Sequence, residues 1–514
     1  MKQIKKLWDE SPLKLIIGIA LFFRIIAAFF SKGFGMHDDH FLIIEASKSW
    51  VDGYDYNHWL PWSPGNVGPE GHSFFYVGIH YLLFSFFKLI GVQNPQFQML
   101  IIRILHAFYS LLIVSISFNI TKKISNLKNA RIVGIFLATY FILPFLSVRN
   151  LVEVVCVPLL LAGISKTINF ENKEKNMLPL IWAGFLFGLA FSVRFQTIMF
   201  TGGVGLALLF RKKWKETFFV AIGTLVSIVL IQGGIDIFIW GTPFTELGEY
   251  IRYNLTHAQD YNVVPWYTYL LLIAGILIPP ISIFFIFGFF QNWKKNLIIF
   301  LPTLLFFLFH SYFPNKQERF ILPVLPFIII LGIIGWNRFK DNSRFWKNHI
   351  KLHRACWIFF WIINLALLPV ISVMYSKKAR VETMTYLSAY PNIPSMIIEN
   401  TNEYSTKQAP RFYLNQWIPI YEISKSAGSN TVENEIEKSK KEPAFVIFEG
   451  PDNLQARVDS IKNILPNIVP DTVIKPGFVD EFLHYINPIN ANQTSIIYRN
   501  KDIFPKKVSN YEKN

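Results

Sequence analysis

The sequence predicts an all-α polytopic membrane protein with a small α/β domain at its C-terminal end. Of its 514 residues, 52% are hydrophobic, 17% aromatic and only 16% charged, which is too apolar for an ordinary soluble protein. Several runs approach the roughly 20 apolar residues with which a helix crosses a bilayer. The composition becomes polar after the last of these runs. We therefore predict a membrane domain over residues 1–376 and a soluble α/β domain over residues 377–514.

Short basic clusters separate the apolar runs and set the expected orientation. The formal net charge is +16, and clusters such as Arg211-Lys212-Lys213 and Trp293-Lys294-Lys295 follow the positive-inside pattern of membrane proteins. No basic stripe lies on a soluble domain, so we expect no nucleic-acid partner. The N-terminal run is long for a signal peptide, and we expect an uncleaved anchor that starts in the cytoplasm.

Hydropathy and the loop charges together predict eleven spans. These lie at about 13–31, 101–120, 132–148, 151–168, 178–197, 199–211, 217–237, 267–290, 296–312, 320–338 and 355–375. Counting the apolar stretch 74–90 as a twelfth span would place the basic loop 121–131 outside. If residues 74–90 instead form a helix lying in the membrane interface, the basic loops again fall on the cytoplasmic side. The first outer loop is therefore expected to cover residues 32–100.

The predicted C-terminal domain alternates short β-type runs with helical patterns. The expected strands are 395–398, 411–414, 444–448 and 494–498, and the expected helix is 454–464. This domain has no phosphate loop, metal-ligand spacing or nucleophile motif. The sequence leaves open whether it is structural or positions an acceptor.

The first outer loop opens with His37-Asp38-Asp39-His40. A general base requires a carboxylate that its neighbours hold and partly desolvate, and adjacent acids shift each other's pKa. An ordinary polar loop and a metal site are the alternatives, although adjacent residues rarely all reach one ion. Glu45 lies seven residues after Asp38, so it shares the same face if this stretch is helical.

Ionisable residues also stand within or between the later apolar runs. Arg149, Asn150 and Glu153 occupy a tight connection between two predicted spans. Burying an ionisable group at membrane depth costs free energy, so such a group is taken first as a candidate functional residue. The plainer interpretation is an Arg–Glu pair that closes the turn. Arg24 and Arg194 are expected to pair with acids, and Arg194 is the better candidate for binding an anion.

Two further outer loops combine charge with aromatic rings. Asp236 ends a span, and the loop that follows contains Asn254, Trp266 and Tyr269. Rings beside polar groups suit carbohydrate stacking and equally form the aromatic belt at a membrane interface.

The next outer loop is very short and carries Lys316, Glu318 and Arg319. Its two cations suit a lipid-linked phosphate, with the acid between them. Snorkelling of both cations to the interface is the alternative. All these motifs fall on one predicted side of the membrane, which indicates an enzyme at the surface and not a channel.

Together these stretches resemble the polytopic GT22-type mannosyltransferases that add mannose to the GPI-anchor core and to lipid-linked oligosaccharides. The resemblance covers roughly residues 10–340 and rests on four ordered pieces. These are Asp38, Asp39 and Glu45; Arg149, Asn150 and Glu153; Asp236, Gly241, Tyr253, Asn254, Pro265, Trp266 and Tyr269; and Asn315 to Phe320 with Pro323 and Pro326. The chain departs from the pattern of the family in four places. Asp39 replaces a Glu, Asn315 a His and Gln317 a Glu, and Glu70-Gly71-His72-Ser73 stands where the eukaryotic members have an Arg-Ser.

The resemblance implies a GT-C fold and an inverting glycosyltransferase that takes mannose from a polyprenyl-phosphate donor. The acceptor would be a hydroxyl of a glycan or glycolipid, and neither a cofactor nor a metal would be required. Asp38 would be the general base, with Asp39 beside it. The donor phosphate would be bound by Lys316, Arg319 and Arg194. The orienting residues would be His37, Glu45, Arg149, Asn150, Glu153, Asp236, Asn254, Trp266 and Tyr269.

Alternatives to mannose transfer stay open at this point. They are a transferase for another lipid-linked sugar, a lipid-linked sugar flippase or transporter, and a non-catalytic assembly subunit. Most ionisable residues lie at one face, which disfavours transport. The composition, rich in Lys, Asn and Ile, suggests a bacterial inner-membrane protein whose active site and C-terminal domain are extracytoplasmic.

Overall fold

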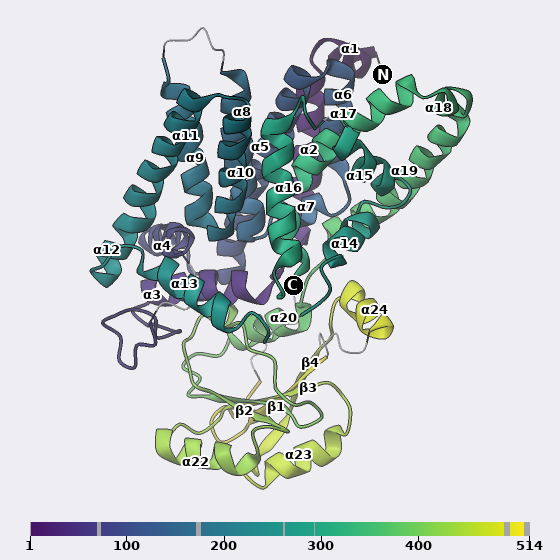
Figure 1. Cartoon of the computed structure of the whole chain (residues 1–514). Helices are drawn as coiled ribbons and strands as arrows, with labels where there is room; N and C mark the ends of the chain where they lie inside the picture. Colours follow the sequence, from purple (N-terminus) through teal and green to yellow (C-terminus); the bar gives the residue numbers. More distant parts are fainter. Residues whose placement is uncertain are drawn as a thin grey trace. The chain divides into compact units, whose positions relative to one another are not determined.

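The computed structural model describes residues 2–68, 73–170, 176–260, 263–291, 293–487 and 494–507. The chain forms two compact units (Figure 1), each built from separate stretches of sequence. Unit 1 comprises residues 1–30, 57–80 and 102–373, and unit 2 comprises residues 31–56, 81–101 and 374–514. The helices α4 (Phe74–Leu89) and α5 (Pro95–Ile124) contribute residues to both units.

The regular elements of unit 1 in the described part of the chain are helices. Its elements are α1 (Lys2–Glu10), α2 (Pro12–Phe30), α6 (Leu127–Thr139), α7 (Leu143–Leu146), α8 (Val152–Asn169), α9 (Leu178–Val193), η2 (Phe195–Thr197), α10 (Ile198–Phe210), α11 (Trp214–Ser227), η3 (Ile228–Gly233), α12 (Gly234–Trp240), α13 (Thr245–Thr256), α14 (Thr268–Ile276), α15 (Ile281–Gln291), α16 (Leu297–Tyr312), η4 (Glu318–Val324), α17 (Leu325–Asn342), α18 (Arg344–Asn348) and α19 (Ile350–Ser372). Helices α8, α9 and α11 pack side by side, as do α10 and α16 (Figure 1).

Six helices in the described part of the chain are long and apolar enough to cross a membrane. They are Pro12–Phe30, Pro95–Ile124, Val152–Asn169, Trp214–Trp240, Glu318–Asn342 and Ile350–Ser372. The pair α14 and α15 passes the same test as one unit, although a bend of 120° separates its two halves. Shorter apolar helices are Phe74–Leu89, Leu178–Val193, Phe195–Phe210 and Leu297–Tyr312. The chain is therefore a multi-pass membrane protein, and the number eleven stays a prediction.

The predicted span 132–148 is broken. Helix α6 ends at Thr139, and α7 is a single turn that begins after the extended Tyr140. The side chain of Asn364 replaces the interrupted helical hydrogen bonds: its Oδ1 accepts from Phe141 N at 2.9 Å, and its Nδ2 donates to Thr139 O at 2.8 Å. Hydropathy does not register this break, because the run around it is predominantly apolar.

Unit 2 contains a five-stranded mixed sheet. Its elements are η1 (Asp39–Glu45), α3 (Ala46–Val51), α20 (Lys378–Leu387), β1 (Met396–Asn400), α21 (Arg411–Leu414), β2 (Ile420–Ser424), α22 (Ser429–Ser439), β3 (Phe445–Glu449), α23 (Leu454–Lys462), β4 (Ile468–Ile474), α24 (Phe478–Ile486) and β5 (Ser495–Asn500). The strand order is β2-β1-β3-β5-β4. Strand β1 pairs in parallel with β2 and β3, whereas β5 pairs antiparallel with β3 and β4. Helices α22 and α23 cover one apolar face of this sheet (Figure 1).

The predicted α/β character of this region is confirmed, but one strand is wrong. Residues 411–414 form the helical turn α21, and its apolar residues Phe412, Tyr413 and Leu414 are all buried. A short apolar run has no periodicity that would separate a strand from a helical turn. Strands β2 and β4 were not predicted, and β4 contains a proline at a register shift.

The segment 31–56, which carries the predicted catalytic acids, belongs to unit 2. Gly33 forms a parallel bridge with Ser376, and Ser376 N donates to Lys32 O at 3.1 Å. Gly33 has φ +77°, and a Cβ there would lie 1.9 Å from Ser376 O. Only glycine allows this approach, which joins the start of the loop to residues that follow α19 directly.

Candidate functional site

A buried group of two arginines around one glutamate lies in unit 1. Arg194 Nη1 donates to Glu153 Oε1, and Arg319 Nε lies 3.5 Å from the same oxygen. All three side chains are buried. The ring of Phe320 lies 5.0 Å from the Arg194 guanidinium and 5.6 Å from that of Arg319. Two fixed cations around one carboxylate leave a local excess of positive charge, which suits an anion.

Three separate breaks in helical structure bring these residues together. Glu153 lies in the first turn of α8, and Arg194 is the extended residue at which α9 ends. Arg319 lies in the 3₁₀ segment η4, where its Nε also donates to Gln317 Oε1 at 2.9 Å. In the described part of the chain, Arg194 Nε and Nη2 have no hydrogen-bond partner although both are buried. These two nitrogens are therefore available to donate hydrogen bonds to a ligand.

The remaining residues of the Arg149 motif are buried in the same unit. The Arg149 guanidinium lies 4.3 Å from the centroid of the Phe145 ring. Asn150 hydrogen bonds to His80 of α4. Arg194 was expected to pair with an acid, and that acid is Glu153, whose Oε1 also lies near Arg319. Sequence spacing could not connect these segments.

Arg24 differs from its prediction. Among the described residues it bonds to a hydroxyl and to carbonyl groups, and not to an acid. Its Nε donates to Ser110 Oγ at 2.9 Å, and its other nitrogens donate to the carbonyl oxygens of Ala20, Leu137 and Ala138 at 3.2–3.3 Å. A guanidinium has five N–H donors, and here a hydroxyl and three backbone carbonyls, two of them in the last turn of α6, accept from it without an acid.

Lys316 links two backbone segments. Its Nζ donates to Phe313 O at 2.6 Å, Val264 O at 3.1 Å and Pro314 O at 3.4 Å. Burial lowers the pKa of Lys316. The three contacts use the donors of one ammonium group, so direct contact with a phosphate would require a carbonyl to be released.

The predicted sugar-binding residues of the outer loops differ in exposure. Tyr269 is buried, and its hydroxyl donates to Gln317 O at 3.0 Å. Asn254 Nδ2 donates to Tyr250 O at 2.8 Å within α13. Trp266 is exposed, so among these three it offers a free ring face for stacking.

Asp236 forms a buried pair with Glu246, which the sequence analysis did not identify. Gln232 Nε2 donates to Asp236 Oδ1 at 2.9 Å and to Glu246 Oε2 at 2.7 Å. Glu246 N donates to Asp236 Oδ2 at 3.2 Å, and Phe74 N, at the start of α4, donates to Glu246 Oε2 at 2.9 Å. Burial, followed by the nearby charge of Asp236, raises the pKa of Glu246 to about 8. The pair joins α12, α13 and α4.

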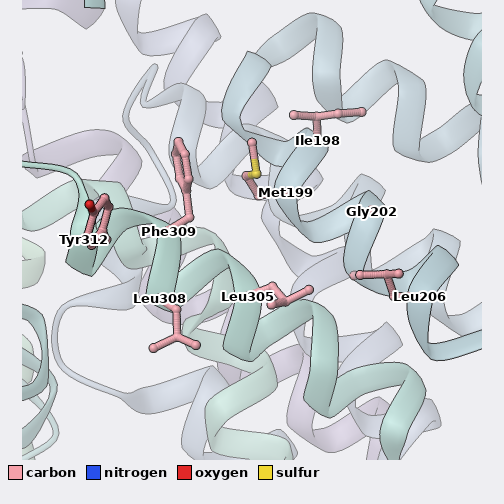
Figure 2. Close-up of a pocket in the computed structure, with 9 residues that line it drawn as sticks. Ile198, Met199, Gly202, Leu206, Leu305, Leu308, Phe309 and Tyr312 are labelled. Atoms are coloured by element: carbon pink, nitrogen blue, oxygen red, sulfur yellow. The ribbon is translucent and has the colours of Figure 1, made fainter. Parts of the chain in front are cut away.

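An open apolar groove of about 440 Å³ lies between α10 and α16. Figure 2 shows the side chains that line it, which are Ile198, Met199, Leu206, Leu305, Leu308, Phe309 and Tyr312, together with Gly202; Gly203 completes the lining. The groove includes the first residue of α10, four residues after Arg194, and the last residue of α16, four residues before Lys316. Hydropathy predicts only spans for these residues.

In unit 2, Asp38 and Asp39 have different environments. The Asp38 side chain is 37% exposed, and its Oδ1 lies 3.6 Å from His37 Nδ1. The other nitrogen of His37, Nε2, lies 2.5 Å from Gln408 Oε1. Asp39 is only 4% exposed. Of the two acids, Asp38 can therefore reach a substrate from solvent.

Glu45 and His40 form the buried side of the same segment. His40 Nε2 lies 3.3 Å from Glu45 Oε1, which also accepts a hydrogen bond from Phe412 N at 3.0 Å. The His40 ring stacks on Phe34 at 4.4 Å and on Tyr413 at 5.5 Å. Burial lowers the pKa of His40, and the carboxylate of Glu45 opposes this shift only in part.

The described residues contain no group of three or more His, Cys, Asp or Glu that could hold a metal ion. The residues that the sequence analysis missed are mainly partners of those it found, such as Glu246, Gln232 and Gln408. Each is a single polar residue without a motif, and its role depends on a contact distant in sequence. Only the fold could identify them.

Comparison with known proteins places the chain in a family. The sequence model of the Alg9-like mannosyltransferase family matches residues 15–414. GPI mannosyltransferase 3 of Kluyveromyces lactis is 26% identical over 230 residues, which cover 39% of this chain and 36% of that protein. The Dol-P-Man:Man(7)GlcNAc(2)-PP-Dol alpha-1,6-mannosyltransferase of Drosophila melanogaster is 26% identical over 281 residues, or 51% of this chain and 38% of that protein. The match thus spans little more than a third of these relatives.

A solved structure has the same fold across almost the whole chain. ArnT from Cupriavidus metallidurans, crystallised with undecaprenyl phosphate, superposes with a TM-score of 0.59 at 12% sequence identity, covering 94% of this chain and 97% of ArnT. This likeness confirms the predicted GT-C fold, a helical membrane bundle with a small C-terminal sheet. With the family match over most of its length, the chain belongs to the Alg9-like mannosyltransferase family.

Proposed function

We propose that the protein is a membrane glycosyltransferase that transfers mannose from a polyprenyl-phosphate donor to a hydroxyl of a glycan or glycolipid. Family membership supports the reaction class. The observation that carries the proposal is the buried pair Arg194 and Arg319 around Glu153, next to an apolar groove along the chain. The arginines suit the phosphate of a lipid-linked donor, and the apolar groove suits its lipid chain.

Arg194 and Arg319 are assigned to the donor phosphate. The bond from the anomeric carbon to the phosphate oxygen breaks during transfer, and negative charge grows on the departing phosphate. Cations fixed in place before the reaction stabilise this charge without reorganising. Glu153 holds both guanidinium groups in a buried setting, and Arg194 has N–H donors to spare. Lys316 adds positive charge, although carbonyl oxygens engage its ammonium.

The groove between α10 and α16 is assigned to the polyprenyl chain of the donor. It is lined by aliphatic and aromatic side chains, and it reaches the helix ends next to Arg194 and Lys316 in sequence. An apolar chain in this groove would leave its phosphate at those ends. ArnT, which has the same fold, was crystallised with undecaprenyl phosphate, a ligand of the class proposed here.

Asp38 of unit 2 is assigned as the general base. It would remove the proton from the acceptor hydroxyl while the hydroxyl oxygen attacks the anomeric carbon. Its exposure, and an imidazole at 3.6 Å, support this choice over the buried Asp39. One displacement with attack opposite the leaving phosphate inverts the configuration at the anomeric carbon.

Asp39 and Glu45 are assigned as groups that hold the loop of Asp38. Asp236 is assigned to holding α13, and Trp266 to sugar stacking.

No divalent metal is required in this scheme, because the leaving group is already an activated phosphate. The arginine cations stabilise the negative charge that grows on it. We propose a bacterial polyprenol as the lipid of the donor. In the proposed orientation, the inner membrane carries the reaction and unit 2 on its extracytoplasmic face. Undiminished transfer in EDTA would support the metal-free scheme, and loss of transfer that Mg²⁺ or Mn²⁺ restores would contradict it.

The test is sugar transfer by the purified full chain reconstituted in lipid. Donors would be polyprenyl-phosphate-mannose and polyprenyl-phosphate-glucose, and acceptors would be glycolipids extracted from the source membranes. We expect mannose transfer by wild type and its loss in Asp38→Asn. Asp55→Asn is the matched control, since this carboxylate of the same segment accepts from Trp50 Nε1 at 2.9 Å. Near-normal turnover by Asp38→Asn would contradict the base, and transfer of glucose alone would contradict the donor sugar.

A further inference from the structure

Helix α24 presents an apolar face that the described residues leave exposed. Phe478, Phe482, Tyr485 and Ile486 are 77%, 52%, 86% and 63% exposed, respectively. Their spacing of i, i+4, i+7 and i+8 puts them on one stripe of the helix. The opposite side carries Asp480, which is buried. Four large apolar side chains on one exposed stripe exceed the scattered apolar residues of an ordinary soluble surface.

The buried side of α24 is attached to the segment that follows α19 directly. The Asp480 carboxylate accepts hydrogen bonds from the backbone N–H groups of Lys377 and Lys378. At Gly477, just before the helix, a Cβ would lie 3.1 Å from Tyr375 O. Helix α19 is a candidate span that ends at Ser372. The residues that hold α24 are thus three to six positions beyond the end of a membrane-crossing helix.

We propose that α24 is an interfacial helix whose Phe478–Phe482–Tyr485–Ile486 face inserts into the headgroup region of the membrane that the spans cross. The attachment of α24 to residues 375–378 keeps it near the point where the chain leaves α19. Membrane proteins concentrate Tyr and Trp at this depth, which suits Tyr485, and Phe is typical of the apolar face of interfacial helices. Amphipathic helices lie in the plane of the interface with such a face buried in lipid.

The charges around α24 are mixed in sign, with the acids Asp480 and Glu481 in the helix and Lys475 before it. Lys475 is exposed just before the helix and can meet lipid phosphates, and Glu481 borders the apolar stripe, where it can remain in water. Unit 2 would then be held at the membrane by α24 in addition to its covalent links. This inference needs only a membrane-spanning chain and is independent of the proposed reaction.

The test uses site-directed spin labels on the full chain in nanodiscs of phosphatidylethanolamine and phosphatidylglycerol. In a background of Cys156→Ala and Cys356→Ala, single cysteines would replace Phe482, Tyr485 and, as a control, Glu437. Glu437 is exposed on α22 of the same unit. The collision rates of each label with oxygen, which dissolves in lipid, and with a water-soluble nickel chelate report its surroundings.

We expect labels at 482 and 485 to be several-fold more accessible to oxygen, relative to the nickel chelate, than the label at 437. Equal ratios at all three positions would overturn the proposal in favour of water. Low accessibility to both reagents at 482 and 485 would overturn it in favour of a covering protein segment. Dipolar broadening between labels on two chains would overturn it in favour of a second copy.

A second pair of variants separates lipid insertion from folding. Phe482→Asp places a charge on the apolar stripe, and Asn463→Asp places one at an exposed site of the same unit. We expect Phe482→Asp to lower the oxygen preference of the label at 485 severalfold, with an unchanged thermal unfolding midpoint, and Asn463→Asp to change neither. An unchanged preference in Phe482→Asp would contradict insertion of this face.

Discussion

Glu45 and Phe412 are joined by a hydrogen bond across 367 residues of sequence, in which Phe412 N donates to Glu45 Oε1 at 3.0 Å. Glu45 is fully buried and also lies against His40. The residue that sequence spacing placed beside Asp38 therefore links the first loop to the C-terminal region. This contact joins two stretches of unit 2, residues 31–56 and 374–514, that are far apart in the sequence.

Removal of the Glu45 carboxylate should destabilise unit 2. Glu45→Ala leaves a buried backbone N–H without its acceptor, which costs about 1–3 kcal/mol, whereas Glu45→Gln keeps an acceptor oxygen. We expect a lower unfolding midpoint for Glu45→Ala and a smaller change for Glu45→Gln, measured by thermal unfolding in detergent. Equal midpoints for wild type and Glu45→Ala would contradict the role of this bond.

Acid should weaken the same region through His40. Burial lowers the pKa of His40 below its ordinary value of 6.5, so the unfolded chain binds more protons than the folded chain once the pH falls below this value. The contribution of neutral His40 is complete above the unfolded pKa and is lost as the pH falls. We expect the unfolding midpoint of wild type to drop between pH 7 and 5, and His40→Gln to reduce this dependence. Identical pH slopes for both proteins would exclude His40 as the cause.

Alkaline pH should act through Glu246. Its pKa is raised from 4.5 to about 8, so the folded state holds a proton that the unfolded state releases above 4.5. The stabilisation is complete below the unfolded pKa and is lost as the pH rises through about 8. Glu246→Gln stays neutral and keeps an acceptor for Phe74 N, so its midpoint should fall less than that of wild type between pH 6 and 9. A steeper fall in the variant would contradict a protonated Glu246.

A bulky residue in the groove should weaken donor use without damaging the fold. A Cβ at Gly202 or at Gly205 meets nothing within 4 Å, but only Gly202 lines the groove (Figure 2). We expect Gly202→Phe to raise the donor KM by about tenfold, a loss of roughly 1.4 kcal/mol. Gly205→Phe on the same helix is the control and should leave KM unchanged. Similar KM values for both variants would indicate that the lipid binds elsewhere.

A lysine at position 194 should not replace Arg194 in mannose transfer, although it keeps the positive charge. Lysine keeps the cation but not the planar donor pair, and loss of one donor to a developing oxyanion costs about 10²–10³ in kcat. We expect this loss in Arg194→Lys, while Arg252→Lys, on an exposed arginine paired with Glu249, should behave as wild type. The measurement is kcat for mannose transfer at saturating donor. An unchanged kcat in Arg194→Lys would remove this residue from the phosphate site.

Unusual charged residues could be recognised from the sequence, but their contacts could not. Arg194 and Glu153 stood out because charged residues in apolar runs are rare, but their pairing arises from the end of α9 and the start of α8, which spacing does not encode. Glu246 was missed because one acid in the polar helix α13 has no signal of its own. Hydropathy also passed over the break at Tyr140, where an asparagine distant in sequence completes the backbone hydrogen bonds.

The bridge between Gly33 and Ser376 has a consequence for the order of assembly. A ribosome makes the segment with Asp38 more than 300 residues before residues 374–424, which supply its packing partners. Residues 31–56 therefore lack these contacts until α19 has been inserted and residues 374–424 have been made. The finished arrangement can therefore form only after translation is nearly complete, and a chain stalled before residue 374 would have its spans but not the support of its acidic loop.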